Sequence, residues 1–203
     1  HIRARLAGLY PQLHVDLLGV TTQGDRVLDR PLASIGGKGL FIKELEVAMS
    51  EGRADIAVHS LKDLPMEMPD GFALAAVTAR EDLGRADRFA DSLAPDVSRP
   101  AAGQGALAIE CLRDRPDLAD VLAPLADLAT TLAVTAERAF ARSLSGNCRT
   151  PLAAYGEWSG ERLWLRGLVA GVDGREVIRG ERDARVEDAR DRAQLRAIHK
   201  AGL

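Results

Sequence analysis

The chain has 203 residues, of which 46% are hydrophobic and 28% are charged, and its net charge is −3. This composition is ordinary for a soluble globular protein with one large domain or two small ones. The charge balance lacks the basic field typical of nucleic-acid binders, and no apolar run approaches the roughly 20 residues that a membrane helix needs. We therefore expect neither a nucleic acid nor a membrane as a partner.

The cysteines and histidines argue against two further kinds of site. Cys111 and Cys148 lie far apart and form no CxxC motif, which argues against a disulfide framework and favours a reducing, cytoplasmic location. The histidines show no metal-ligand spacing, and we expect no structural or catalytic metal. The four histidines are His1, His14, His59 and His199.

Helix-like and strand-like segments alternate over roughly the first 80 residues. Apolar residues recur at helical spacing in two segments, and three others are short apolar or β-branched runs. The predicted helices cover residues 2–10 and 40–49, and the predicted strands cover 14–20, 55–58 and 72–77. This strand–helix–strand order predicts an α/β layer with a parallel sheet.

The pattern weakens from Glu81 to Arg99 and then recovers. A strand is predicted over 106–109, and the clearest helix of the chain over 127–144, with Asp127 as its N-cap. Gly146 stands where a helix-ending glycine is expected. The residues that mark the expected buried side of this helix are Leu128, Leu132, Ala136, Ala139 and Leu144.

The pattern changes again beyond Cys148. Short apolar runs alternate with turn signals, and a charged helical segment follows them. The predicted strands cover 152–155, 163–172 and 176–182, the turns are Ser159-Gly160 and Asp173-Gly174, and the helix covers 186–200. The C-terminal part is therefore predicted to be an α+β unit with a three-stranded antiparallel sheet.

Polar residues follow the predicted strand over 55–58, in the segment His59-Ser60-Leu61-Lys62-Asp63-Leu64-Pro65. Open α/β sheets bind ligands at the carboxyl ends of their strands, and a carboxylate beside an ammonium can hold charge on a reacting molecule. The alternative, which this segment alone favours, is a surface turn with a solvated Lys62–Asp63 pair.

Three other loops carry candidate site residues. The glycine-rich segment around Lys38 could hold an anion on its backbone N–H groups, although a flexible turn is the alternative because the spacing of a phosphate-binding loop is absent. Cys148 lies beside Arg149, which would favour the thiolate, whereas an unreactive small hydrophobe is the alternative. Cys111 is interpreted as structural, and Gln104 could bring its amide next to a ligand.

These pieces occur in an order that resembles one family, porphobilinogen deaminase, also called hydroxymethylbilane synthase. Each piece alone is common, but the combination is specific and extends over nearly the whole chain. The segments that carry the resemblance are 36–41, 43–46, 55–65, 100–106, 137–140 and 146–151.

The resemblance implies a cytoplasmic, monomeric transferase of tetrapyrrole and heme biosynthesis. Members of the family join four porphobilinogen molecules head to tail, with loss of ammonia, and release hydroxymethylbilane. The implied cofactor is a dipyrromethane held by a thioether to Cys148. Asp63 matches the catalytic aspartate, which would stabilise the positive charge that forms on a pyrrole when ammonia leaves.

Further binding roles follow from the same resemblance. Lys62, Ser60 and Gln104 would contact the cofactor and the growing chain. Lys38 would pair with the acetate and propionate groups of the substrate, and Phe41 would lie against a pyrrole ring from a loop over 34–42.

The implied fold is an α/β lobe like those of periplasmic binding proteins, with a parallel or mixed sheet, and a C-terminal α+β domain that carries Cys148. Four segments are expected along the chain. They are a first lobe over 1–82, a remnant of the second lobe over 83–99, a return to the first lobe over 100–125 and the C-terminal domain over 126–203.

Two parts of the family pattern are absent, the N-terminal segment and most of the second lobe, whose arginines should bind the cofactor carboxylates. Either the 203 residues are the retained parts of a longer enzyme, which we favour, or this is a shortened gene product. For a shortened product we expect weak or no turnover, and normal hydroxymethylbilane production would refute that expectation. The functional alternatives are a non-catalytic small-molecule-binding protein and an inactive remnant of the same fold.

Overall fold

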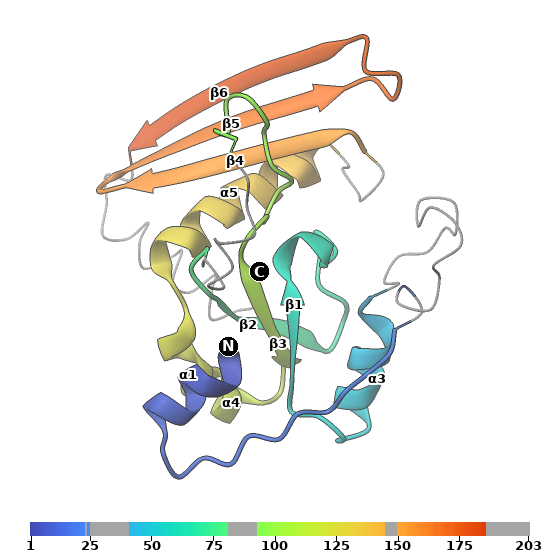
Figure 1. The fold of residues 1–203 in the computed structure, drawn as a ribbon, viewed down its shortest axis with the longest axis vertical. Coiled ribbons are helices and arrows are strands. Elements are labelled where there is room, and N and C mark those ends of the chain that lie inside the picture. Colours follow the sequence, from blue (N-terminus) through green and yellow to red (C-terminus); the bar gives the residue numbers. More distant parts are fainter. Residues whose placement is uncertain (23, 25–40, 81–92, 145–149, 186–203) are drawn as a thin grey trace.

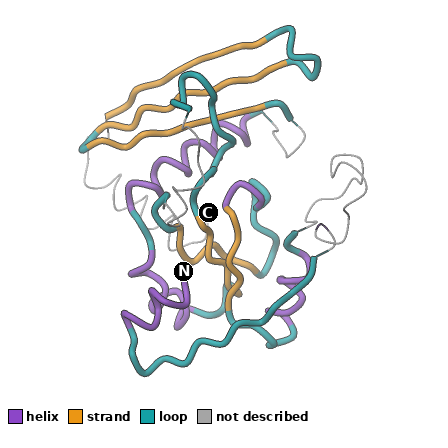
Figure 2. The backbone as a smooth tube through the Cα atoms, viewed as in Figure 1, coloured by secondary structure: helices purple, strands orange, loops and turns teal. Residues whose placement is uncertain are grey.

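The computed structural model describes residues 1–22, 24, 41–80, 93–144 and 150–185. These residues form two three-stranded sheets with helices around and between them (Figure 1). Figure 2 shows that the longest helix lies along the C-terminal sheet, on the side that faces the first sheet. The elements that position the candidate site are therefore the first sheet, this helix and the loops that join them.

The first sheet contains β1 (Ile56–Ser60), β2 (Phe72–Val77) and β3 (Leu107–Leu112) in the order β1-β3-β2. Both pairings are antiparallel, so the parallel sheet expected from the sequence is wrong for the described strands. The reason is that β3 returns between β1 and β2, which run in the same direction but do not touch. The order of strand and helix patterns along the chain does not reveal such an insertion.

Helices cover both faces of this sheet. On one face α3 (Lys43–Ser50) packs Met49 against Ala57 and Phe72. On the other face α1 (Ile2–Leu9), α4 (Pro116–Leu122) and the 3-10 turn η4 (Ala123–Leu125) meet the sheet. Their contact residues form one cluster that includes Leu6, Leu122, Leu125, Ala76 and Ile109.

The long helix α5 (Leu128–Ser143) begins as predicted, because the Asp127 side chain accepts a hydrogen bond from the Thr130 N–H at 2.7 Å. The predicted buried side is correct at Leu132 but wrong at Leu128 and Leu144, which are 41% and 44% exposed, and at Ala139, which is also exposed. The helix lies between two layers, so it buries polar residues as well as apolar ones. A single apolar stripe therefore does not describe it.

The C-terminal sheet contains β4 (Leu152–Ser159), β5 (Arg162–Ala170) and β6 (Val177–Arg185), each paired antiparallel to the next. The predicted three-stranded antiparallel sheet is confirmed, with β4 and β6 longer than expected. Gly160 and Gly174 have φ of 62° and 70°, the left-handed conformation that the two predicted turns require. The helix predicted over 186–200 lies outside the described residues.

The strand predicted over 14–20 is wrong, since this segment has no regular secondary structure. Leu17 and Leu18 are 72% and 50% exposed. A strand needs a neighbour for its backbone N–H and C=O groups, and no described strand pairs with this segment.

No single described helix is long and apolar enough to cross a membrane. Within the described residues, one pair of successive helices, Pro116–Leu125 and Leu128–Ser143, has the length and apolar composition of a membrane span when the two are taken together, but the pair is bent by 109°.

Candidate functional site

The polar motif forms a short turn at the end of β1. Ser60 ends the strand, and the 3-10 turn η2 covers Leu61–Asp63. Leu61 and Leu64 are 0% and 1% exposed and pack in one core cluster, whereas Ser60, Lys62 and Asp63 are exposed. The two leucines therefore anchor the turn in the core and leave the hydroxyl, the ammonium and the carboxylate on the surface.

The loop that carries Gln104 lies beside this turn. The Leu61 N–H donates to the Ala106 carbonyl at 2.9 Å, and Gly103 has φ of 79°. A Cβ atom on Gly103 would lie 3.0 Å from Leu61 Cγ, so both the conformation and the close approach require glycine. Gln104 itself is exposed. The structure thus brings the loop of Gln104 and the turn of Lys62 and Asp63 together.

Of the two remaining candidate segments, the structure describes Phe41 at the end of one. Phe41 is half-buried, and its ring lies so close to Gly24 that a Cβ atom there would overlap it. The next residue, Ile42, packs in the same core cluster as Leu61 and Leu64, which places Phe41 at the border of the site. Lys38 and Cys148 lie outside the described residues.

His59 belongs to the interior rather than to the site. Its Nε2 lies 2.9 Å from Oε2 of Glu110, and the two residues are 8% and 0% exposed. Alternate residues of a strand face opposite sides of the sheet, so His59 points away from its exposed neighbour Ser60. Cys111, the next residue on β3, is a free buried thiol whose pKa is raised by burial and by Glu110. This agrees with the structural role predicted for Cys111.

Sequence reasoning gave no role to four residues that surround the site. Glu137 of α5 is fully buried, and its carboxylate accepts bonds from the backbone N–H groups of Gly103 and Gly156, both at 2.7 Å, and from Arg80. Arg80 also donates to the Gln104 carbonyl at 3.1 Å. The other two, Arg138 and Arg142, donate to backbone carbonyls that follow the Asp63 turn. The family-like segment 137–140 was the sequence signal for Glu137 and Arg138.

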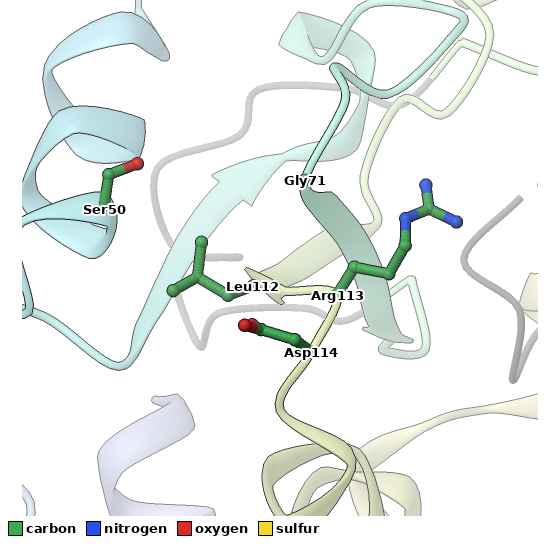
Figure 3. Close-up of a pocket in the computed structure, with 5 residues that line it drawn as sticks. All are labelled: Ser50, Gly71, Leu112, Arg113 and Asp114. Atoms are coloured by element: carbon green, nitrogen blue, oxygen red, sulfur yellow. The ribbon is translucent and has the colours of Figure 1, made fainter.

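A hollow of about 610 Å³ opens at the other end of the first sheet (Figure 3). It lies where β3 ends and β2 begins, whereas Ser60 pairs with Leu107 at the opposite end of the register. Arg113 points away from the other side chains drawn in Figure 3, and it donates to the Phe72 carbonyl at 3.0 Å. The lining residues are Ser50, Gly71, Leu112, Arg113 and Asp114, none of them a candidate site residue.

Comparison with known proteins finds two family models along the chain. Residues 1–86 match "Porphobilinogen deaminase, dipyromethane cofactor binding domain", and residues 131–197 match "Porphobilinogen deaminase, C-terminal domain". The porphobilinogen deaminase of Chromobacterium violaceum is 40% identical, over 100% of this chain and 90% of its own length. That of Burkholderia thailandensis is 40% identical, over 96% of this chain and 82% of its own.

The chain is shorter than these relatives. Its alignment with the Chromobacterium protein runs over 277 positions, which is more than the 203 residues of this chain. The relative therefore has internal residues without a counterpart in this chain. The two family-model matches leave residues 87–130 between them, and this range includes residues 87–99 of the stretch where the sequence pattern weakens.

Proposed function

The chain belongs to the porphobilinogen deaminase family, and from this premise we propose that the exposed edge formed by Ser60, Lys62, Asp63 and Gln104 is its active site. The protein is an enzyme, a transferase that makes hydroxymethylbilane from porphobilinogen with a dipyrromethane cofactor. The observation that carries the assignment of the site is the convergence of the β1 turn and the 101–105 loop, two segments about 40 positions apart in the chain.

The exposed residues fit a cofactor that carries carboxylates. Lys62 provides an ammonium, Ser60 a hydroxyl and Gln104 an amide, which are groups that pair with or donate to carboxylates. Among the described residues neither Lys62 nor Asp63 has an ion-pair partner. Both charges are therefore available to a bound molecule.

The proposed attachment of the cofactor to Cys148 is supported by the position of α5. Arg142, in the last turn of this helix, donates to the Met66 carbonyl at 3.3 Å. The helix therefore ends close to the segment that follows Asp63. Cys148 follows Leu144, the C-cap of α5, by four positions in the sequence, and this short connection limits how far its sulfur can lie from the segment that follows Asp63.

Each residue has a role set by its chemistry. When bound, the dipyrromethane supplies the end on which the pyrrole chain grows. Asp63 would stabilise positive charge on the substrate pyrrole as ammonia leaves, and it can exchange a proton with the pyrrole nitrogen. Lys62 and Lys38 would hold the acetate and propionate groups, and Phe41 would cover a ring. We also propose that the enzyme is a cytoplasmic monomer, which size-exclusion chromatography checks in part.

The test is Asp63→Asn, assayed by hydroxymethylbilane formation. We expect the rate to fall at least about 100-fold, because the stabilising charge is lost. The thermal midpoint should change little, since the side chain is exposed. Asp70→Asn, at an exposed aspartate on the following loop, is the matched control and should keep the full rate. An Asp63→Asn variant with unchanged turnover would refute the proposed site.

Intact mass spectrometry tests the attachment separately. The purified chain should carry the mass of a dipyrromethane, and Cys148→Ser should remove it, because the thioether needs the sulfur. A bare mass for the unmodified chain would instead favour the alternative, a non-catalytic small-molecule-binding protein of the same fold.

A further inference from the structure

Two arginines of α5 hold the backbone that follows the catalytic turn. Arg138 donates to the Pro65 carbonyl and, at 3.5 Å, to the Leu64 carbonyl. Arg142 lies one helical turn further along α5 and donates to the Met66 carbonyl at 3.3 Å. The three acceptors are consecutive and begin immediately after Asp63. One face of α5 therefore binds residues 64–66, the segment that directly follows the turn.

The chemistry of this contact is unusual for a structural arginine. Arg138 is 6% exposed, and no carboxylate in the described ranges forms an ion pair with it. Burial and, as the smaller cause, the neighbouring Arg142 lower the pKa of its guanidinium to about 10. A buried cation without a counter-charge is unfavourable, because no ion pair offsets the desolvation of the guanidinium. The bonds to the two backbone carbonyls are therefore the contacts that hold Arg138 in this position.

The acceptors need a donor from outside their own segment. Residues 64–66 belong to no helix or strand, so no ladder supplies partners for their carbonyl groups. Leu61 and Leu64 fix the buried side of the turn, but apolar contacts leave the direction of the exposed Lys62 and Asp63 side chains loosely defined. Hydrogen bonds to the next carbonyls fix the direction in which the backbone leaves the turn.

We propose that Arg138, assisted by Arg142, is a positioning residue that holds the Lys62–Asp63 turn in its catalytic geometry. This inference rests on the proposed role of Asp63. It makes α5, which also precedes Cys148 in the sequence, the element that holds the backbone beside the proposed catalytic carboxylate. Arg138 itself does not touch the substrate in this proposal, and it acts through the backbone of residues 64 and 65.

The first experiment compares Arg138→Met and Arg138→Lys with the unmodified enzyme, each carrying its cofactor. Arg138→Met should lower kcat at least about tenfold while the dipyrromethane mass is retained, because a small displacement of a catalytic group is costly. Arg138→Lys should recover part of the rate, since one donor remains. Arg113→Met is the control, because Arg113 also donates to a backbone carbonyl but at the opposite end of the same sheet. It should keep the full kcat.

A second comparison separates positioning from general destabilisation. Arg138→Met is combined with Asp63→Asn, and all rates are measured well below the thermal midpoint of each variant. Because the main effect of positioning the turn is exerted through the Asp63 carboxylate, adding Arg138→Met to Asp63→Asn should lower the residual rate less than twofold. An equal loss of rate with and without the Asp63 carboxylate would overturn the inference. If Arg138→Met does not fold, Arg142→Met, which removes only the bond to Met66, replaces it in the same comparison.

The outcomes also distinguish this inference from the proposed function. A slow Asp63→Asn variant beside a fully active Arg138→Met variant would refute the positioning role and leave the active site in place. A fully active Asp63→Asn variant would refute the proposed site, whatever the arginine variants do.

Discussion

Glu46 on α3 faces a buried acid–base pair. Glu110 and His59 are in contact on the sheet below it, and the second carboxylate oxygen of Glu110 has no hydrogen-bond partner within the described structure. The pKa of Glu46 is raised by its burial and by Glu110, whereas His59 acts in the opposite direction. The charged form of Glu46 is therefore disfavoured in the folded protein.

The direction of this shift predicts how stability depends on pH. The folded protein holds the Glu46 proton at pH values where the unfolded chain has released it. The contribution of Glu46 to the free energy of unfolding is therefore present below the unfolded pKa and is lost as pH rises through the folded pKa. Glu46→Gln should therefore be more stable than the unmodified protein at about pH 7, and the gain should vanish at about pH 3.5. Urea midpoints at the two pH values measure it. Glu67→Gln, at an exposed position, should show no such difference, and a gain for Glu46→Gln that is equal at both pH values would contradict the argument.

Local signals at the scale of single residues are reliable in this chain. The cap at Asp127 and the turn glycines Gly160 and Gly174 are all confirmed, because a cap or a turn depends on residues only a few positions away. The partners of Glu137 and Arg138 are different, since Gly103 is 34 positions from the first and Pro65 is 73 from the second. No nearby pattern marks such contacts, so their roles could not be predicted.

At the scale of elements, periodicity located most helices and strands but not their environment. The strand over 72–77 is confirmed in full, whereas the parallel arrangement was wrong because β3 enters from a distant part of the chain. The buried side of α5 was wrong for a related reason. This helix has the C-terminal sheet on one side and the segment after the Lys62–Asp63 turn on another, and a pattern of apolar residues records only apolar contacts.

The contact between α5 and β4 depends on a glycine. Gly156 lies so close to the helix that a Cβ atom would come within 2.9 Å of the Ala133 carbonyl oxygen. Since that atom belongs to the helix backbone, it cannot move without shifting the whole element. Gly156→Ala should therefore cost about 1–3 kcal/mol of unfolding free energy, as overpacking in a well-packed interior does.

The control for Gly156→Ala is Gly180→Ala on β6, where a Cβ atom would meet nothing within 4 Å. Both glycines lie inside strands of the same sheet and neither has a positive φ. Denaturant unfolding compares the two variants. Equal stabilities for Gly156→Ala and Gly180→Ala would show that the helix and the sheet are packed less closely than the structure indicates.

At the scale of the whole molecule, several contacts bind the C-terminal sheet to the rest of the chain. In the segment expected to be a remnant of the second lobe, Asp96 pairs with Arg166 of β5 at 2.5 Å, and Arg99 donates to the Gly167 carbonyl at 3.3 Å. Arg80, just beyond β2, donates to the Gly156 carbonyl of β4 at 3.2 Å and lies 4.7 Å from the centre of the Tyr155 ring. The end of the first sheet is thus tied directly to the edge of the second.

Arg80 and Glu137 form the centre of this connection, and their pairing predicts a measurable coupling. Glu137 is fully buried, so Arg80→Met would leave its charge without a cation. Breaking a buried pair costs about 3–5 kcal/mol, and we expect the lower end because Arg80 is 21% exposed. Glu137→Gln should also destabilise the protein, since it weakens the bonds to Gly103 and Gly156. The double variant should lose at least about 1 kcal/mol less unfolding free energy than the sum of the two single-variant losses, because the pair can be lost only once.

Denaturant unfolding of the four proteins measures this coupling, and the rate of hydroxymethylbilane formation provides a second readout. Arg80 holds the carbonyl of Gln104, and Glu137 holds the N–H of the adjacent Gly103. Loosening the pair should therefore lower turnover as well as stability, because the 101–105 loop forms one side of the proposed site. Strictly additive losses of stability, together with an unchanged rate, would mean that the sheets are joined independently of Arg80 and Glu137 and that the site does not depend on their connection.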